Sequence, residues 1–275
     1  MTRFDVARTQ QPKSTAAYGS LRFGPLRYQL KRTIGMLPTP DNSECSRQAQ
    51  GKPLANLGTS PPNAAMTEKP DLESAYALQT PDDSRRLYAQ WAKTYDSDFA
   101  EQNGYILHEQ VARHFVNMGG FGPVLDVGAG TGLCGVCLRA RGVEPVDGTD
   151  ISKEMLAVAE AKGCYRAVFT GDVLLGLDAA EGTYQGVVSS GTFTHGHVGP
   201  DGIDAMMHVV RPRGWIVLSV NAAHFQAAGF VAKIAMLEPY ISDLTTTEVP
   251  IYANDAPGEH ARDTALLLAF RKAEK

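Results

Sequence analysis

The sequence has few cysteines, no long apolar run and, over most of its length, no excess of basic residues. Its four cysteines in 275 residues are too few for a disulfide framework. No apolar run approaches the ~20 residues that cross a bilayer, and no signal-peptide pattern is present. These absences predict a cytoplasmic protein with no membrane partner.

Charge divides the chain into two unlike parts. Residues 1–65 hold nine Lys or Arg and three Asp or Glu, a net charge of +6. The whole chain has 26 basic and 30 acidic residues, so the remainder holds 17 and 27, a net charge of −10. Because phosphate binding needs clustered Lys and Arg, we expect no nucleic-acid partner for this acidic part.

The N-terminal segment has prolines scattered among Ser, Thr, Gln and Arg, without a helical or strand period. This pattern predicts a disordered extension over residues 1–66 and a globular domain over residues 67–275. The Arg-rich, acid-poor composition also suits an organelle transit peptide, which is the alternative for localisation. A further interpretation is that Met66 is the working start, because ordered patterning begins only after it.

An apolar run that ends in three glycines spaced two apart lies near the middle of the chain. The run Val124–Val127 predicts a buried strand, and residues 133–141 predict a helix. The glycines between them are Gly128, Gly130 and Gly132. A strand, a glycine turn and a helix N-terminus form a nucleotide-type site. The dinucleotide fingerprint also fits in shifted register, so the glycines alone leave a dinucleotide open.

Asp126 argues against a dinucleotide. A carboxylate two residues before the first glycine would repel a pyrophosphate, whereas it would attract an ammonium group. S-adenosyl-L-methionine carries such an ammonium and no phosphate. Residues 126–132 also resemble the first motif of the class I S-adenosylmethionine-dependent methyltransferases, which is acid-x-Gly-x-Gly-x-Gly.

The resemblance extends over about residues 87–270 and implies the fold of that family. We expect an α/β protein with a doubly wound, seven-stranded, mostly parallel, Rossmann-like sheet preceded by N-terminal helices. Residues 245–252 and 264–270 are expected to form an antiparallel closing hairpin. One helix from residue 80 is expected to place Tyr88, Trp91 and Tyr95 on one face, and residues 221–225 are expected to form a loop. The segment Trp91–Asp96 resembles the lead-in of the methyltransferase-like group named after the Williams-Beuren region.

Asp150 ends the next predicted strand, 20 residues after Gly130. An acid at this place can accept both hydroxyls of a ribose. The resemblance implies further cofactor contacts: Ile151 against the adenine ring, Asp172 on its amino group, the Val173 N–H on a ring nitrogen, Tyr95 over the methionine end, and Ser190 at the end of the fourth strand.

The loop 191–197 follows the fourth predicted strand, next to the place where an open α/β sheet binds ligands. His195 is the candidate general base, with His197 and His224 as alternatives. No acid or cysteine is close enough in the sequence to complete a metal site with the loop histidines, so no metal is predicted. Cys134 and Cys137 form a Cys-x-x-Cys pair that suits either redox chemistry or packing.

These features predict an S-adenosylmethionine-dependent methyltransferase whose acceptor is a small molecule. The fourth strand is not followed by an Asn/Asp-Pro-Pro-aromatic segment, which argues against amide or adenine N-methylation. Two alternatives stay open: a protein that binds S-adenosylmethionine without transferring its methyl group, and an NAD(P)-dependent oxidoreductase.

Overall fold

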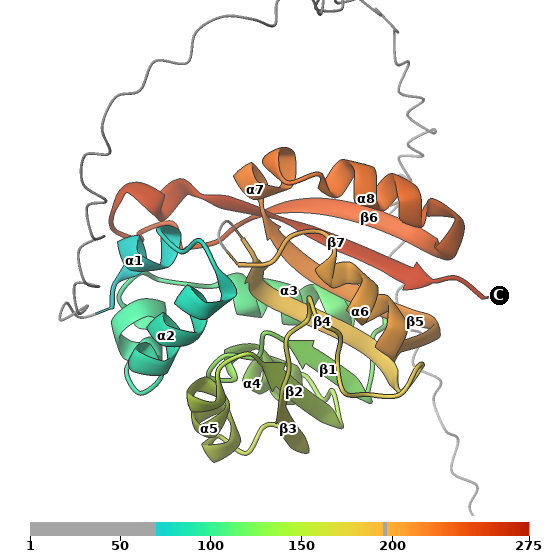
Figure 1. The fold of residues 1–275 in the computed structure, drawn as a ribbon, viewed down its shortest axis with the longest axis horizontal. Helices are drawn as coiled ribbons and strands as arrows, with labels where there is room; N and C mark the ends of the chain where they lie inside the picture. Colours follow the sequence, from blue (N-terminus) through green and yellow to red (C-terminus); the bar gives the residue numbers. More distant parts are fainter. Residues whose placement is uncertain (1–69, 195–196, 275) are drawn as a thin grey trace, which may run out of the picture. The chain divides into compact units, whose positions relative to one another are not determined.

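The computed structural model describes residues 70–194 and 197–274, so the predicted disordered extension over 1–66 lies outside the described residues. Helices and strands alternate over much of this part (Figure 1). The strands are β1 (Val124–Val127), β2 (Val146–Asp150), β3 (Ala167–Thr170), β4 (Tyr184–Phe193), β5 (Val210–Asn221), β6 (Ile241–Pro250) and β7 (Thr264–Lys272). The α-helices are α1 (Leu72–Tyr76), α2 (Pro81–Trp91), α3 (Leu107–Asn117), α4 (Leu133–Ala140), α5 (Lys153–Ala161), α6 (Gly202–Val209), α7 (Ala222–Ala227) and α8 (Phe230–Leu237).

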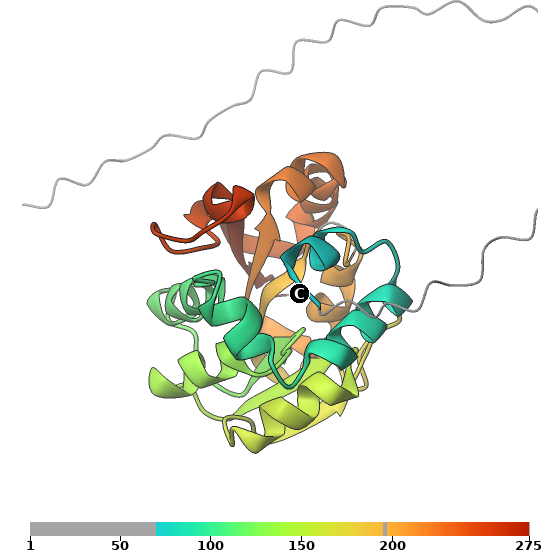
Figure 2. The ribbon, with the colours of Figure 1, turned by 90° about the vertical axis from the view of Figure 1, so that its left-hand side faces the viewer.

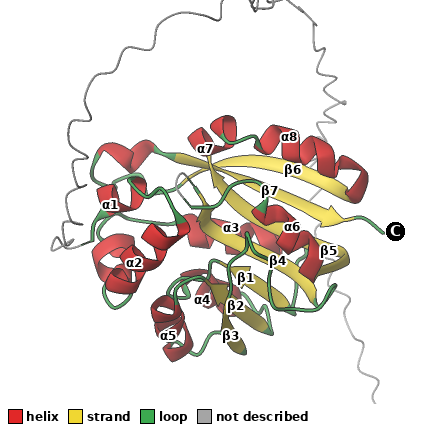
Figure 3. Ribbon diagram, in the orientation of Figure 1, coloured by secondary structure: helices red, strands yellow, loops and turns green. Residues whose placement is uncertain are grey.

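The seven strands form one sheet in the order β3-β2-β1-β4-β5-β7-β6 (Figure 3). Neighbouring strands from β3 to β5 pair in parallel, whereas β7 runs antiparallel to both β5 and β6. The predicted doubly wound, mostly parallel sheet and its antiparallel closing hairpin are therefore confirmed. Because β1 and β4 are neighbours although β2 and β3 intervene in the chain, the strand order reverses beside β1, where such sheets bind ligands.

The sheet lies between two apolar layers, and β1 contributes to both. Val124 packs in a cluster with residues of α3 and α4, whereas Leu125 and Val127 pack in a second cluster with residues of α6 and α8. This division follows from the period of two along a strand. Asp126 shares the orientation of Val124 and so points to the α4 side. Figure 2 shows helices on either side of the sheet when the molecule is turned.

The lead-in before β1 differs from the single helix expected from residue 80. Thr80 caps α2 as predicted, since its side chain accepts the Asp83 N–H and the Asp83 carboxylate accepts the Thr80 N–H. The helix ends at Trp91, however, and a short π-helix follows at Asp96–Glu101. Tyr95 therefore lies past the end of α2, at the start of the π-helix, and the prediction of one continuous helix is wrong. The predicted packing of Tyr88, Trp91 and Tyr95 on one face is confirmed by the contacts between their rings.

The loop expected after β5 is also wrong, because α7 begins there. The Asn221 side chain accepts the N–H groups of Ala223 and His224, which is the N-cap arrangement. Among the described residues, no helix combines the length and the apolar character that crossing a membrane requires.

Candidate functional site

A cavity of ≈ 1050 Å³ opens at the carboxyl ends of the parallel strands, beside the glycine turn. This volume includes the open solvent at the mouth of the cavity. The lead-in helix α2 closes it from outside the sheet, at the side where Figure 1 shows α1 and α2. Eight of the residues predicted to bind a cofactor line this cavity: Tyr95, Gly128, Gly130, Asp150, Ile151, Asp172, Val173 and Ser190.

Three predicted site residues are not on its wall. Gly132 caps α4 in a left-handed conformation. A Cβ at this position would lie 3.2 Å from Ala159 and Tyr165. Asp126 lies beneath α4, on the opposite side of β1 from Val127, which does line the cavity. His195, the predicted base, lies outside the described residues.

Two glycines of the turn have positive φ angles but different surroundings. Gly128 has φ of 71°, and a Cβ there would lie 1.9 Å from Thr192 Oγ1. Gly130 has φ of 54°, but a Cβ there would meet nothing within 4 Å, because it would point into open space. Only glycine adopts both positions without strain.

Asp150 holds this turn from the end of β2. Its carboxylate accepts the Gly130 N–H at 2.8 Å and the Ser152 N–H at 2.8 Å. Burial raises the pKa of the carboxyl group, while these N–H donors lower it. The side chain thus presents an acceptor-only group to the cavity, fixed in orientation by two backbone bonds.

Asp126 is fully buried and has a different environment. Tyr165 donates its hydroxyl to Asp126 Oδ2 at 2.7 Å, whereas Oδ1 is buried and has no partner among the described residues. Desolvation raises the pKa of this carboxyl group to about 7, with a smaller contribution from Asp150. Hydrogen bonding from Cys134 and Gly135 at the start of α4 lowers this pKa, and Cys134 also lines the cavity.

Two ionic contacts fasten the lead-in over the cavity. Asp96 accepts the hydroxyl of Thr131 in the glycine turn and the ammonium of Lys162, each at 2.5 Å. Arg85 of α2 contacts Asp172 at 3.2 Å, and Asp172 also accepts the Leu174 N–H at 3.0 Å. Asp96 thus helps to hold the lead-in against the glycine turn, a role that the sequence did not indicate.

A second cavity of ≈ 570 Å³ adjoins the first. The two share part of their walls, namely Tyr88, Tyr95, Tyr105, Gly191 and His197. Among the described residues that line the second cavity, none is Asp, Glu, Lys or Arg. Its wall is instead rich in aromatic residues. The hydroxyl oxygen of Tyr88 lies 3.0 Å from His197 Nε2.

Several wall residues were not predicted as site residues. Tyr105, from the chain just before α3, places its hydroxyl 3.4 Å from Ser190 Oγ. Burial raises the pKa of Tyr88 and of Tyr105, so both hydroxyls stay protonated at neutral pH. The helical spacing of Tyr88 and Trp91 predicted a packed face, but nothing in the sequence shows that Tyr88 meets a loop 109 residues away.

Comparison with known proteins adds a family match. Residues 124–214 match a family model described as a methyltransferase domain. Human methyltransferase-like protein 27 is 32% identical over 160 residues, which cover 53% of this chain and 62% of that protein. The aligned region thus spans less than two thirds of the relative.

The solved structures that resemble this chain share little of its sequence. A Thermoplasma acidophilum protein has a TM-score of 0.48 at 18% identity, covering 72% of this chain and 100% of its own. The YcgJ protein of Bacillus subtilis has a TM-score of 0.44 at 14% identity, covering 61% of this chain and 100% of its own.

Proposed function

We propose that the chain is a class I S-adenosylmethionine-dependent methyltransferase that transfers the methyl group of this cofactor to a small-molecule acceptor, since residues 124–214 match a methyltransferase domain and the sheet has the expected strand order. The observation that carries the proposal is the pairing of an oriented, half-buried carboxylate, Asp150, with an open glycine turn at Gly130. S-adenosylmethionine supplies an electrophilic methyl group on a sulfonium.

The cavity wall fits a cofactor that has a ribose and no phosphate. Among the described residues that line it, none is Lys or Arg, while Asp150 and Asp172 both face it. A pyrophosphate beside Asp150 would meet a carboxylate with no cation on the cavity wall to offset the repulsion, which disfavours NAD(P). We propose that Asp150 accepts the ribose hydroxyls and that Ile151 and Val173 contact the adenine ring.

Tyr95 and Ser190, which also line the cavity, would then hold the methionine end. Asp172 is proposed to accept the adenine amino group, in competition with Arg85, which already contacts its carboxylate. Tyr88, Tyr95 and Tyr105 also line the cavity, and their rings would shield a bound cofactor from water.

The second cavity is the proposed place of the acceptor. It adjoins the methionine end through Tyr88, Tyr95 and Tyr105, and its uncharged aromatic wall favours a small apolar or aromatic molecule over a phosphorylated one. His197 lies in the wall of both cavities and can take a proton from a hydroxyl or ammonium acceptor near pH 7. Orientation of the two reactants in adjoining cavities supplies most of the expected acceleration.

Titration of the purified chain with S-adenosylhomocysteine and with NAD tests the cofactor. We expect saturable binding of the first and none of the second, and Asp150→Ala should weaken binding by about 5- to 150-fold, the equivalent of ~1–3 kcal/mol for a lost charge-assisted bond. The exposed Asp201→Ala serves as the control and should bind as the wild type does.

Binding of NAD alone would refute the proposed function. A metabolite screen with radiolabelled S-adenosylmethionine tests the transfer itself. Binding without transfer to any acceptor would favour the alternative of a protein that binds the cofactor without using it.

The unpartnered oxygen of Asp126 leads to a prediction about pH. Asp126 does not line the cavity, so this prediction requires the ligand's ammonium to reach Oδ1 when it binds. The ammonium N–H groups would then favour the ionised carboxylate and lower its pKa from about 7. Affinity for S-adenosylhomocysteine should then rise on the order of 10-fold between pH 5.5 and 7, below the range in which the ligand's amine loses its proton. Asp126→Asn should abolish this rise.

Calorimetry in buffers of different ionisation enthalpy measures the same effect as a proton released on binding. Equal pH dependence in the wild type and Asp126→Asn would show that Asp126 serves only the packing beneath Tyr165.

In the free protein, the raised pKa of Asp126 makes the folded state less stable as the pH rises, which is opposite to the trend expected for binding. The contribution of Asp126 to the free energy of unfolding is full below its unfolded-state pKa of about 3.9 and is lost as the pH rises through its folded-state pKa of about 7.

A further inference from the structure

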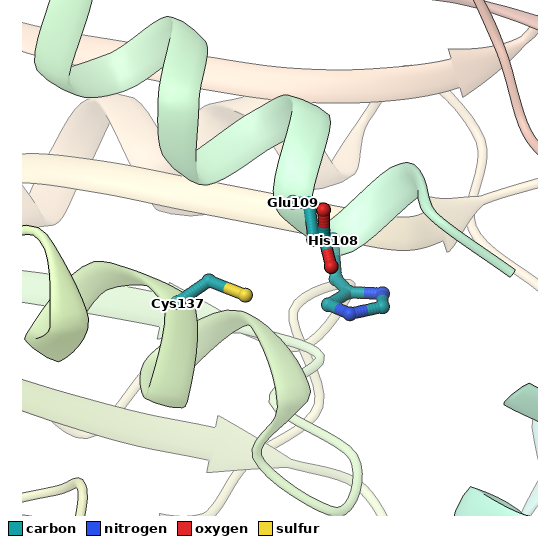
Figure 4. A group of neighbouring side chains, drawn as sticks. All are labelled: His108, Glu109 and Cys137. Atoms are coloured by element: carbon teal, nitrogen blue, oxygen red, sulfur yellow. The ribbon is translucent and has the colours of Figure 1, made fainter. Parts of the chain in front are cut away.

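Three side chains capable of binding a metal lie together between α3 and α4. His108 and Glu109 occupy the first turn of α3, and Cys137 lies on α4. One ligand atom from each residue lies within 4.8 Å of the other two. Figure 4 shows the Cys137 sulfur pointing from α4 toward the start of α3. We propose that these three residues bind a divalent cation of borderline softness, such as Zn²⁺.

The donor set is the first argument for this class of metal. Imidazole nitrogen, carboxylate oxygen and thiolate sulfur together are typical ligands of Zn²⁺, and hard cations such as Mg²⁺ take oxygen ligands instead. The sequence did not indicate the group, because Cys137 follows Glu109 by 28 residues and only the packing of α3 on α4 joins them.

The state of His108 is the second argument. Its Nδ1 is buried and has no hydrogen-bond partner in the described part of the chain. A buried imidazole nitrogen without a partner is costly, and a bound cation would satisfy it if Nδ1 is the ligating atom. The ring also stacks on Tyr105 at 5.4 Å between centroids, which fixes its plane.

The arrangement needs only small side-chain movements to close. Metal–ligand distances of about 2.0–2.3 Å put tetrahedral ligand atoms roughly 3.3–3.8 Å apart. The three ligand atoms now lie within 4.8 Å of one another. Glu109 is exposed and free to rotate toward the group, and Cys137 is half-buried. Three protein ligands leave one position for water, as in open zinc sites.

Lys162 and Arg141 are both close enough to act on His108, and Arg141 also contacts α4 beside the sulfur. Arg141 donates to the Cys137 carbonyl oxygen at 2.9 Å, one turn further along α4. Its positive charge competes with a cation for the sulfur, so its removal should strengthen metal binding. Because His108 also lines the larger cavity, a bound metal would fasten that wall to α4.

Titration of the chelator-treated full chain with Zn²⁺ and Co²⁺ tests the proposal. We expect one equivalent of metal per chain and, with Co²⁺, the charge-transfer absorption that a thiolate ligand gives. Cys137→Ser, His108→Ala and Glu109→Gln should each weaken binding at least as much as the ~10–100-fold that loss of an outer-shell partner costs. Arg141→Gln should tighten it.

Matched controls separate the site from other thiols and histidines. Cys164→Ser removes a buried cysteine between α5 and β3, and His114→Ala removes a histidine further along α3. Both should bind the metal as the wild type does. The proposal is overturned if the wild type binds no stoichiometric metal, or if the thiolate absorption persists in Cys137→Ser. Glu109→Gln changes an exposed side chain, so retained circular dichroism together with undiminished affinity would equally overturn it.

Discussion

Gly128→Ala should lower the free energy of unfolding by more than about 2 kcal/mol. A left-handed conformation costs an L-residue ~1–2 kcal/mol, and the φ of 71° at Gly128 is in that region. The new Cβ would also lie 1.9 Å from Thr192 Oγ1. Thr192 cannot withdraw freely, because its hydroxyl donates to the Val127 carbonyl at 3.2 Å. Urea unfolding measures the loss as a shift in midpoint at constant slope.

Gly130→Ala is the matched comparison, with a different expected result. Its φ of 54° imposes a similar backbone cost, but its Cβ would meet no atom within 4 Å. Stability should therefore fall less than in Gly128→Ala. The added methyl group would occupy the space that we assign to the cofactor, so affinity for S-adenosylhomocysteine should fall by at least about 10-fold.

Two outcomes would contradict this pair of predictions. If Gly130→Ala binds S-adenosylhomocysteine as well as the wild type, the space beside Gly130 is not the cofactor site. If both variants lose equal stability, the close approach of Thr192 to Gly128 has no energetic consequence. The double variant Gly128→Ala with Thr192→Ala should regain part of the lost stability, since the nearest clashing atom is gone.

The sequence predicted the parts of the fold that depend on local patterns. The apolar run into Gly128 predicted β1, and the capping residues at Thr80 predicted the start of α2. It did not predict α8, because this helix begins after Gly229 with no side-chain cap. It also extended α2 through Tyr95, because helical spacing continues past Trp91 while tertiary contacts of Asp96 favour another conformation.

The candidate site shows the same division. Asp150 could be placed from its distance along the chain after Gly130, since strand, turn and helix fix the geometry of a βαβ unit. Asp126 was expected on the cavity wall, but the alternation of β1 turns it toward Tyr165 instead. The contact of Arg85 with Asp172 joins residues 87 apart in sequence, and no periodicity reports such a pair.

His197→Ala should lower kcat by about 10²–10⁴-fold for a hydroxyl or ammonium acceptor, with little change in cofactor affinity. General-base catalysis contributes that much, and His197 is the described imidazole in the wall that both cavities share. The acidic limb of the pH–rate profile should disappear with the imidazole. Tyr88→Phe removes the hydroxyl 3.0 Å from Nε2 and should lower kcat less, because the base remains but loses its orientation.

Two further histidines make this prediction decisive. His224 contacts the Val198 carbonyl oxygen at 3.1 Å and lines neither cavity, so His224→Ala should leave kcat unchanged. His195 is the base that the loop sequence predicts. A large loss in His195→Ala with none in His197→Ala would assign the proton to His195, whereas no loss in either would mean an acceptor that arrives without its proton. Only a loss specific to His197 places the base at the junction of the two cavities, where a proton leaves the acceptor as the methyl group arrives.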